Sequence, residues 1–307
     1  MLDSFLKLKM SLLHIGHITL GTEWQFEGVI SPFSRLYLIT KGEAWVWHHQ
    51  QKFYLQPGNL YLIPSFTLSR YYCNSLMTQY YISFLEETEN GSSVFDLLPF
   101  YYEVPALNLD KKLFKRLLEI NPGRSLPNID PKVYDNQSNL LSFNRTSQDQ
   151  PIAQLMETQG ILLQLLSRFL QNATEATSRQ AQGHIQLRPV LNYIHAHLHE
   201  KITVEQLAAL QRLNVDYFSR QFQNQLGIRP IHYITNKRLE RAQLLITTSS
   251  LSLQEIAERV GIADIYYFSR LLNAVLVYHR PGTEKRMGSI INLSSVFSER
   301  LIQESAS

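Results

Sequence analysis

Short apolar segments separated by turn-forming residues fill the first part of the chain. Strand-like runs rich in Leu, Ile, Val and Tyr lie at 35–40, 43–47, 53–55, 60–63, 67–72 and 78–84. Gly and Pro stand between them, as in Pro57-Gly58-Asn59. Short strands spaced in this way favour an antiparallel β barrel or sandwich over a parallel α/β sheet.

Farther along the chain the spacing of apolar residues becomes helical. Residues 111–118 have this spacing, and residues 152–170 are predicted to form a longer helix with a broad apolar stripe. Such a stripe must be covered, either by the β domain of the same chain or by a second subunit. Residues 171–182 are polar and lack periodicity, which predicts a linker between two domains.

After this linker the sequence repeats itself. Val-Glu-Gln-Leu-Ala at 204–208 is followed by Tyr-Phe-Ser-Arg at 217–220, and Leu-Gln-Glu-Ile-Ala at 253–257 by Tyr-Phe-Ser-Arg at 267–270. A short helix with a small inward Ala, a turn and a second helix are the layout of a helix-turn-helix. A solenoid needs roughly three copies, so two copies favour a pair of helix-turn-helix units.

Capping patterns mark the ends of these helices. Thr203 with Gln206, and Ser252 with Glu255, match the capping-box pattern at the start of the first helix of each unit. Gly227 is placed to end the second helix of the first unit in a left-handed conformation. These signals predict the boundaries of both units.

The polar face of the second helix in each unit carries candidate DNA contacts. The outward residues are Asp216, Ser219, Arg220 and Gln223 in the first unit, and Tyr266, Tyr267 and Arg270 in the second. Side chains near the start of a recognition helix reach base edges in the major groove, and Arg can pair bidentately with guanine. One helix at 230–247, which opens with Pro, joins the units and would let them occupy successive major grooves roughly 34 Å apart.

Charge and composition agree with a soluble protein that binds a polyanion. Residues 184–287 hold 13 Lys and Arg against 8 Asp and Glu, whereas the rest of the chain is close to neutral. Hydrophobic residues make up 44% and charged residues 18%, as in globular domains, and no apolar run is long enough for a membrane helix. The start of the chain lacks a signal-peptide pattern, and Cys73 is the single cysteine, so we expect the reducing cytoplasm.

The repeated segment resembles the AraC/XylS family of transcriptional regulators, whose DNA-binding module is two helix-turn-helix units joined by a central helix. The match lies in Arg-Leu-Glu-Arg-Ala at 238–242, Ile-Ala-Glu-Arg-Val-Gly at 256–261 and Tyr-Phe-Ser-Arg at 267–270. The resemblance implies that the outward residues, Gln223 apart, face bases and that Arg238 lies near phosphate. The chain departs from the family pattern at 272–280, where the expected Phe-Lys-Lys and Gly are missing.

The β segment resembles the cupin-like sensor domain of the same family, chiefly through Lys41-Gly42 and Gln-Pro-Gly-Asn-Leu-Tyr-Leu-Ile-Pro at 56–64. In sugar-responsive relatives the ligand lies inside the barrel, against aromatic and polar side chains of late strands. The resemblance therefore implies a small-molecule effector, with a sugar among the candidates. The residues it implies are Tyr71, Gln79 and Tyr81, with Trp45 or Trp47 as stacking partners. The alternative is that these aromatic residues only fill the core.

Residue patterns for catalysis or metal binding do not appear in the sequence. Metal-dependent cupins need spaced His ligands, whereas His48 and His49 are adjacent at a predicted hairpin tip. His195 and His199 can share a helix face but are expected to be solvated. No phosphate-binding Gly-rich loop or Ser nucleophile motif is found. We therefore expect no catalytic residues, no metal, no cofactor and no enzymatic activity.

The predicted fold class is α+β, with a β-barrel or jelly-roll domain and helices followed by an all-α domain. The predicted boundaries are 1–110 for the sensor domain, 111–170 for a helical dimerisation or packing region, 171–184 for the linker, 185–287 for the DNA-binding domain and 288–307 for a tail of unknown role. Within the DNA-binding domain the first unit spans about 203–225, the linking helix about 230–247 and the second unit about 252–275.

The predicted function is effector-controlled, sequence-specific regulation of transcription by a homodimer bound to double-stranded promoter DNA. RNA polymerase is a further candidate partner, no membrane contact is expected, and the regulator can be an activator or a repressor. Two alternatives stay open. One is a cupin-type enzyme with a helical interaction module, and the other is a DNA-binding regulator whose β domain only dimerises.

Overall fold

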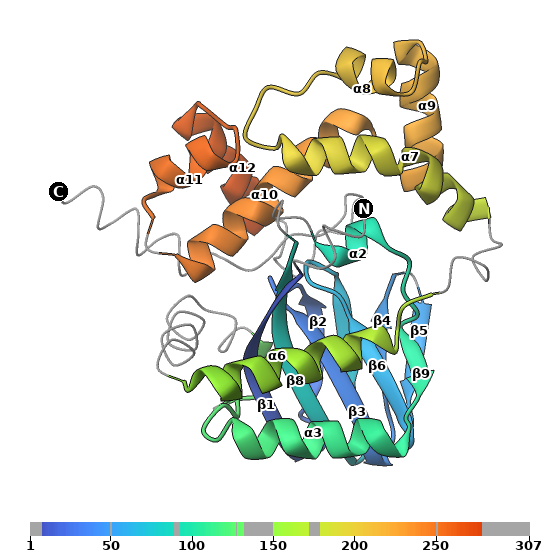
Figure 1. Cartoon of the computed structure of the whole chain (residues 1–307), viewed down its shortest axis with the longest axis vertical. Helices are drawn as coiled ribbons and strands as arrows, with labels where there is room; N and C mark the ends of the chain where they lie inside the picture. Colours follow the sequence, from blue (N-terminus) through green and yellow to red (C-terminus); the bar gives the residue numbers. More distant parts are fainter. Residues whose placement is uncertain are drawn as a thin grey trace.

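A β domain and a helical domain make up the chain, and the helical domain packs on one end of the β domain (Figure 1). The computed structural model describes residues 8–49, 51–88, 93–126, 128–131, 150–171, 179–249 and 251–277. Within these residues no helix has the length and apolar character needed to cross a membrane. The predicted α+β class is confirmed.

Among the described residues, nine antiparallel strands form two sheets in the β domain. The strands are β1 Lys9–Leu20, β2 Gln25–Val29, β3 Ser34–Gly42, β4 Ala44–His48, β5 Gln51–Leu55, β6 Asn59–Ile63, β7 Ser69–Tyr72, β8 Met77–Glu87 and β9 Glu103–Pro105. One sheet has the order β1-β8-β3-β6-β9 and the other has the order β2-β7-β4-β5. The strands predicted between residues 35 and 84 are confirmed, and β1, β2 and β9 are additional.

The five-stranded sheet is buried on both of its faces. On β3, Tyr37 and Ile39 face the four-stranded sheet, while Leu36 and Leu38 face two covering helices. These helices are α3 Asn108–Ile120 and α6 Ile152–Ser167. The apolar stripe of the helix predicted at 152–170 is thus covered by its own β domain, the first of the two alternatives. Side chains that alternate between two cores produce a nearly continuous apolar strand.

The second domain is helical in its described residues, 179–249 and 251–277, and a short helix of the β domain, α2 Val94–Leu97, lies beneath it (Figure 1). Its helices are α7 Arg179–Ala196, α8 Val204–Leu210, α9 Val215–Leu226, α10 Pro230–Thr248, α11 Leu253–Arg259 and α12 Ile265–Val277. The first half of α10 packs in the core of α7, α8 and α9, and the second half packs in the core of α11 and α12. The predicted linking helix is therefore confirmed as a shared support.

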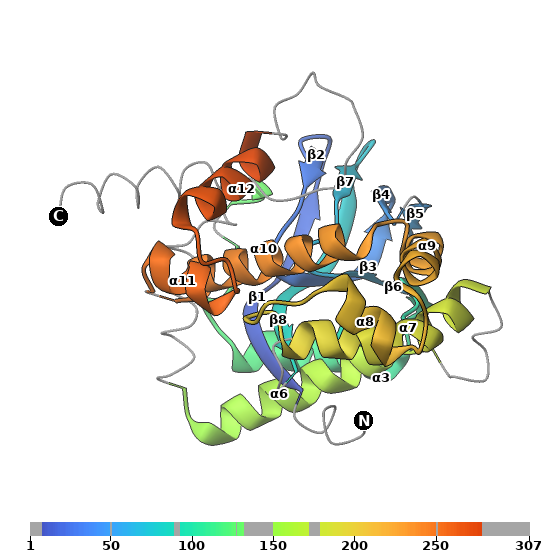
Figure 2. The ribbon, with the colours of Figure 1, turned by 90° about the horizontal axis from the view of Figure 1, so that it is seen from above.

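The predicted linker and the predicted tail lie partly or wholly outside the described residues. Helix α7 begins at Arg179, so the end of the linker predicted at 171–184 is helical instead, while residues 172–178 lie outside the described residues. The predicted tail at 288–307 also lies outside them. Seen from above, α10 crosses over the ends of the strands (Figure 2).

Candidate functional site

The two helix-turn-helix units repeat the same internal packing. Phe218 on α9 and Phe268 on α12 are both fully buried, each against a buried small residue of the preceding helix, Ala208 or Ala257. The turns also match, because the N–H of Leu213 donates to the carbonyl of Ala208 at 3.0 Å and Ile262 donates to Ala257 at 2.9 Å. The predicted internal repeat is therefore a structural repeat.

Side-chain hydrogen bonds cap the first helix of each unit at the position that the sequence predicts. Thr203 and Gln206 form a capping box before α8, and Ser252 and Glu255 form one before α11. Gly227 ends α9 with φ 72°, as the prediction of a left-handed residue requires. These caps satisfy helix-end N–H and C=O groups, which fixes the positions of the outward side chains.

The predicted DNA contacts of the first unit lie on one face of α9. Asp216, Arg220 and Gln223 are exposed and Ser219 is half-buried. The guanidinium Nε of Arg220 donates to the carbonyl of Asp216 at 3.3 Å. Tyr217, absent from the prediction, is also exposed at 53%. Its place in the repeated Tyr-Phe-Ser-Arg segment, next to buried Phe218, is the signal that could have identified it.

The second unit presents the equivalent positions with different chemistry. Tyr266 is 80% exposed and Tyr267 is 44% exposed, and the guanidinium of Arg270 lies 5.9 Å from the Tyr267 ring centre. By position relative to the buried Phe, Tyr266 corresponds to Asp216 and Arg270 corresponds to Arg220. The two units therefore offer related but unequal surfaces.

Arg238 lies on α10 rather than on α9 or α12, and its guanidinium bonds to backbone carbonyls of the helical domain. Its Nε donates to the carbonyl of Leu198 at 3.0 Å, and its Nη2 donates to the carbonyl of Glu200. Burial lowers the pKa of Arg238, although Tyr267 raises it. In this conformation the guanidinium joins α10 to the chain after α7, and its contact with phosphate stays a prediction.

A cavity of about 30 Å³ lies on the face of the five-stranded sheet that is turned toward the four-stranded sheet. Gln79 and Tyr81, both predicted to bind a ligand, line it together with Ile18, Leu20, Trp24, Arg35, Tyr37, Ser83, Leu126 and Ile129. Tyr71, the third predicted residue, is buried behind Trp24 with the ring centres 5.1 Å apart. Among the described residues the side-chain carbonyl of Gln79 is buried without a hydrogen-bond partner.

Arg35 is the main cavity residue that the prediction missed. It is 3% exposed, its guanidinium donates to the hydroxyl of Ser31 and lies 4.7 Å from the Phe33 ring centre. The sequence did contain a signal for Arg35, because it is a charged residue in an otherwise apolar strand. It alternates with Tyr37 and Ile39, so all three side chains lie on the same face of the strand.

Trp45 and Trp47 lie on the opposite face of the four-stranded sheet. Trp45 stacks on Tyr72 with ring centres 5.3 Å apart, and the guanidinium of Arg70 lies 5.3 Å from the Trp47 ring centre. The residue between them, Val46, is the one that faces the cavity side. Since strand side chains alternate between faces, the prediction that these tryptophans stack on an internal ligand is wrong for this conformation.

His48 and His49 lie in contact with each other at the end of β4. His49 adopts φ 48° at the hairpin tip, which turns its ring toward His48, and the two Nδ1 atoms lie 2.9 Å apart. Burial, and to a smaller extent the neighbouring His49, lowers the pKa of His48 to about 3. Among the described residues no group of three or more His, Cys, Asp or Glu is arranged to hold a metal ion.

His195 is not a surface residue, contrary to the prediction. It is 5% exposed and lies between α10 and the β domain, whereas the side chain of His199 is 58% exposed as predicted. The packing of one domain on the other buries His195, and a helical pattern read within one domain does not reveal such a contact.

Comparison with known proteins agrees with the repeated helices. A family model described as a helix-turn-helix domain matches residues 207–276. The chain is 29% identical over 129 residues to the HTH-type transcriptional activator Btr of Bacillus subtilis, covering 42% of this chain and 23% of that protein. It is 34% identical over 97 residues to the uncharacterized HTH-type transcriptional regulator YdiP of Escherichia coli, covering 30% and 32%.

The likeness to solved structures extends over more of the chain. The crystal structure of ToxT from Vibrio cholerae is 11% identical, covers 87% of this chain and 94% of its own, and has a TM-score of 0.41. The chain spans about a quarter to a third of the curated relatives named above. The matched helix-turn-helix domain and the transcriptional regulators that share it show that residues 207–276 form a helix-turn-helix domain of the AraC/XylS type.

Proposed function

We propose that the protein is a sequence-specific DNA-binding regulator of transcription. The observation that carries the proposal is the exposure of equivalent faces on α9 and α12, each held by a buried Phe at the same position. Arg220 and Arg270 stand at matching places on these faces and have the donor geometry that reads guanine. The relatives named as transcription regulators support the same role and support the absence of enzymatic activity.

Selection of binding sequences from a random duplex pool with the full chain tests this proposal. We expect an enriched site with two specific segments about one helical turn apart. Arg220→Ala and Arg270→Ala should each weaken binding to the selected site roughly tenfold or more, and binding to random duplex much less. Lys115→Ala removes an exposed charge from α3 in the β domain and serves as the matched control. Equal losses on both duplexes would contradict base reading.

We also propose that the β domain binds a small effector between its sheets. The buried carbonyl of Gln79 and the nearby Arg35 give the cavity polar groups among aromatic walls. The cavity has room for little more than a water molecule, so a sugar-sized effector requires the lining to move. A thermal-shift screen of sugars and other metabolites, repeated with Gln79→Leu, tests this. A stoichiometric metal in the purified protein would instead favour the enzyme alternative.

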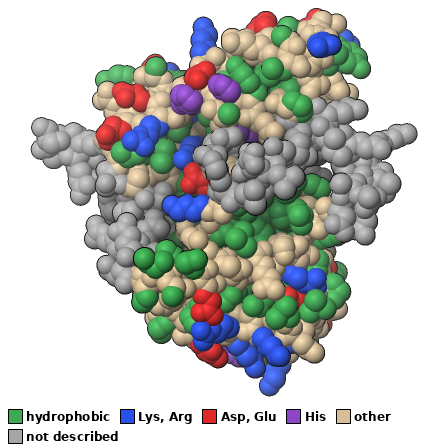
Figure 3. All heavy atoms as spheres, viewed as in Figure 1, with side chains coloured by type: hydrophobic (Ala, Val, Ile, Leu, Met, Phe, Trp, Pro, Cys, Tyr) green, Lys and Arg blue, Asp and Glu red, His purple; other side chains and the backbone are tan. Residues whose placement is uncertain are grey.

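A second copy of the chain is the proposed partner of α6. The outer face of this helix exposes Ile152 at 77%, Met156 at 67% and Leu163 at 41%, and Figure 3 shows hydrophobic side chains on the side that carries α3 and α6. Sedimentation of the chain and of Met156→Glu, with Gln164→Glu on the same helix as control, tests a homodimer. A monomer at working concentration, with and without DNA, would end this proposal. Such a regulator would act in the cytoplasm.

A further inference from the structure

The outer face of the four-stranded sheet carries its side chains in two rows that run across the strands. The first row crosses all four strands and consists of the register partners Gln25, Tyr72, Trp45 and Tyr54. The second row crosses three strands and consists of the register partners Arg70, Trp47 and Lys52. Three aromatic rings therefore lie in one row, and the neighbouring row holds a tryptophan between two cations.

This surface, the outer platform, consists of Trp45, Trp47, Lys52, Tyr54, Arg70 and Tyr72. Tyr54 is 59% exposed and the side chain of Arg70 is 45% exposed. Seen from above, the sheet lies on the side of the β domain away from α3 and α6 (Figure 2). None of the four aromatic residues belongs to the apolar cores formed by the described residues. A group of large rings left outside every core indicates an interaction surface.

Each tryptophan of the platform has a cation over its ring. The ammonium of Lys52 lies 4.3 Å from the Trp45 ring centre, and the guanidinium of Arg70 lies 5.3 Å from the Trp47 ring centre. The electron-rich face of an aromatic ring attracts such cations. Arg70 also lies 3.7 Å from the carboxylate of Glu27, but the side chain of Glu27 is 70% exposed, so this ion pair contributes little.

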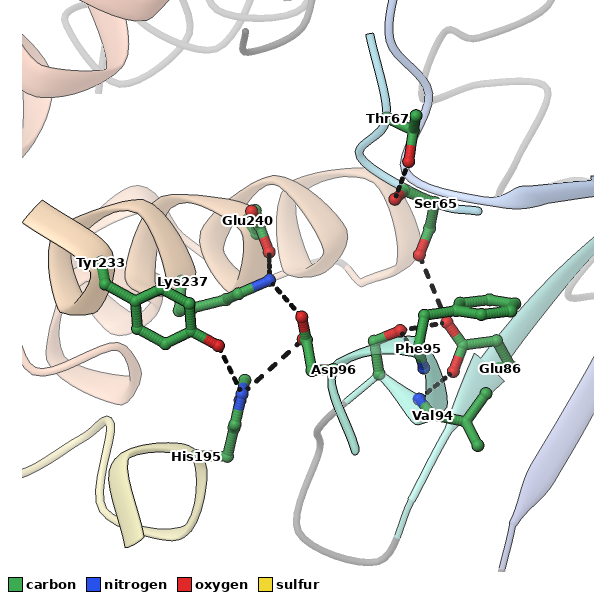
Figure 4. A network of polar contacts seen from close by, with 11 residues as sticks. Ser65, Thr67, Glu86, Val94, Phe95, Asp96, His195, Tyr233, Lys237 and Glu240 are labelled. Carbon is green, nitrogen blue, oxygen red and sulfur yellow. Dashed lines mark hydrogen bonds and ion pairs between the residues drawn. The ribbon is translucent and has the colours of Figure 1, made fainter. Parts of the chain in front are cut away.

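The charge of Lys52 is not balanced in the way that buried charges of this chain are. Lys237 lies 2.8 Å from the carboxylates of both Asp96 and Glu240, as Figure 4 shows. Within the part of the chain that the structure describes, Lys52 forms no ion pair, and its ammonium contacts only aromatic rings. Lys52 and Arg70 therefore make the platform positive, which favours an anionic partner.

The aromatic rings select among anionic partners. A single nucleic-acid strand offers negative phosphates together with bases whose faces are free to stack on Trp and Tyr, whereas a duplex keeps its base faces inside its own stack. Aromatic side chains on the open face of a four-stranded sheet stack two or three bases in RNA-recognition domains. The ring row from β7 to β5 is roughly 10 Å wide, from the usual spacing between strands. An acidic peptide would match the cations but not the rings.

We propose that the outer platform binds single-stranded nucleic acid, with bases stacked on its aromatic rings and phosphates bound by Lys52 and Arg70. A base takes the place of the cation on each tryptophan ring, and the freed side chain turns to a neighbouring phosphate. Both cationic side chains are exposed, so this exchange needs no change of the backbone. The inference is independent of duplex reading by α9 and α12, and it gives the β domain a nucleic-acid surface of its own.

Tryptophan fluorescence of the full chain tests the proposal and locates the binding. The chain has three tryptophans, all in the β domain, and Trp24 is buried, so quenching by stacked bases reports on Trp45 and Trp47. The probe is a single-stranded DNA of about twelve nucleotides. A duplex of the same sequence and polyglutamate serve as comparisons. We expect quenching by the single strand, with a slope of log affinity against log salt near −1.4 for two phosphate contacts.

Substitutions on the platform have matched controls. Tyr54→Leu should weaken single-strand binding roughly fivefold or more, because one stacked base loses its ring, whereas Tyr54→Phe keeps the ring and should bind like the parent chain. Lys52→Gln should reduce the magnitude of the salt slope by about 0.7. Lys111→Gln removes an equally exposed charge from α3 and should leave the slope unchanged. Tyr54 and Lys52 are exposed, so the melting temperatures of all four variants should stay close to that of the parent chain.

Several results would overturn the proposal. Unchanged tryptophan fluorescence with the single strand would remove the site, and equal quenching by the duplex would exclude stacking on open bases. Equal quenching by polyglutamate would assign the platform to an acidic protein instead. Equal losses in Lys52→Gln and Lys111→Gln would show attraction by overall charge alone. Arg220→Ala should leave single-strand quenching intact, so a failure of duplex reading and a failure of this proposal are distinguishable.

Discussion

Arg212 and Gly261 occupy equivalent turn positions in the two helix-turn-helix units and share a left-handed backbone, with φ 56° and 74°. Each follows the buried Ala of its first helix by the same number of residues. Both turns require a residue in the left-handed conformation, but only the first turn has room for a side chain at that residue. A methyl group on Gly261 would lie 2.5 Å from the carbonyl oxygen of Leu198.

We therefore expect Gly261→Ala to destabilise the helical domain by more than about 2 kcal/mol, from left-handed strain and the backbone clash together. Arg212→Gly should change stability by less than about 1 kcal/mol, because relief of strain is offset by the greater freedom of the unfolded chain. Gly160→Ala in α6 is the control, since its new methyl group meets nothing within 4 Å. Urea unfolding measures all three, and equal effects at 212 and 261 would contradict the packing argument.

Replacing Arg238 separates its two candidate roles. Arg238→Met removes two charge-assisted hydrogen bonds to the carbonyls of Leu198 and Glu200, so we expect a loss of stability of about 2 to 4 kcal/mol. If Arg238 also binds phosphate, the slope of log affinity against log salt should fall by about one. A slope lower by about one would support the phosphate contact. An unchanged slope together with a lower melting temperature would assign Arg238 to packing within the helical domain alone.

The outward residues that differ between the units should affect different parts of the DNA site. We expect Asp216→Ala and Tyr266→Ala each to cost about 1 to 3 kcal/mol of discrimination, at base pairs about one helical turn apart. Both side chains are exposed, so melting temperatures should hardly change. Repeating the sequence selection with each variant measures this. Relaxed preference at the same base pairs in both variants would argue against two separate readers.

Glu86 should make stability depend on pH. Burial raises its pKa to about 8 from the usual 4.5, although hydrogen bonds from Val94 and Ser93 act to lower it. The folded chain therefore binds this proton more tightly than the unfolded chain, and stability should fall as pH rises from about 5 to 8, by an amount on the order of a few kcal/mol. Glu86→Gln should flatten this dependence, while Glu119→Gln on the exposed face of α3 should not. Melting temperatures across this pH range provide the measurement.

Local signals in the sequence were sufficient for the boundaries of the two helix-turn-helix units. Thr203, Ser252 and Gly227 cap helices through hydrogen bonds to residues only a few positions away. Short sequence patterns therefore predict these caps and the helix ends that they mark. Strand β1 escaped prediction because it is buried on both faces in most of its length, which removes the alternation that marks a half-buried strand.

Contacts between distant segments account for most of what the sequence did not predict at the candidate sites. The side of the sheet on which Trp45 lies depends on the pairing of β4 with β5 and β7, which one strand's pattern does not specify. His195 is buried by Asp96, nearly a hundred positions earlier in the chain. Arg35 was the exception, since its alternation with Tyr37 was visible in the sequence.

If the unequal faces of the two units read bases as proposed, the DNA site has a direction. Because Asp216 stands where the second unit has Tyr266, a site turned end for end presents each unit with the base pairs that suit the other. One copy of the chain therefore distinguishes the upstream from the downstream side of its site. A second copy bound alongside must follow either a head-to-tail or a head-to-head order, and the arrangement of half-sites at a promoter would reveal which.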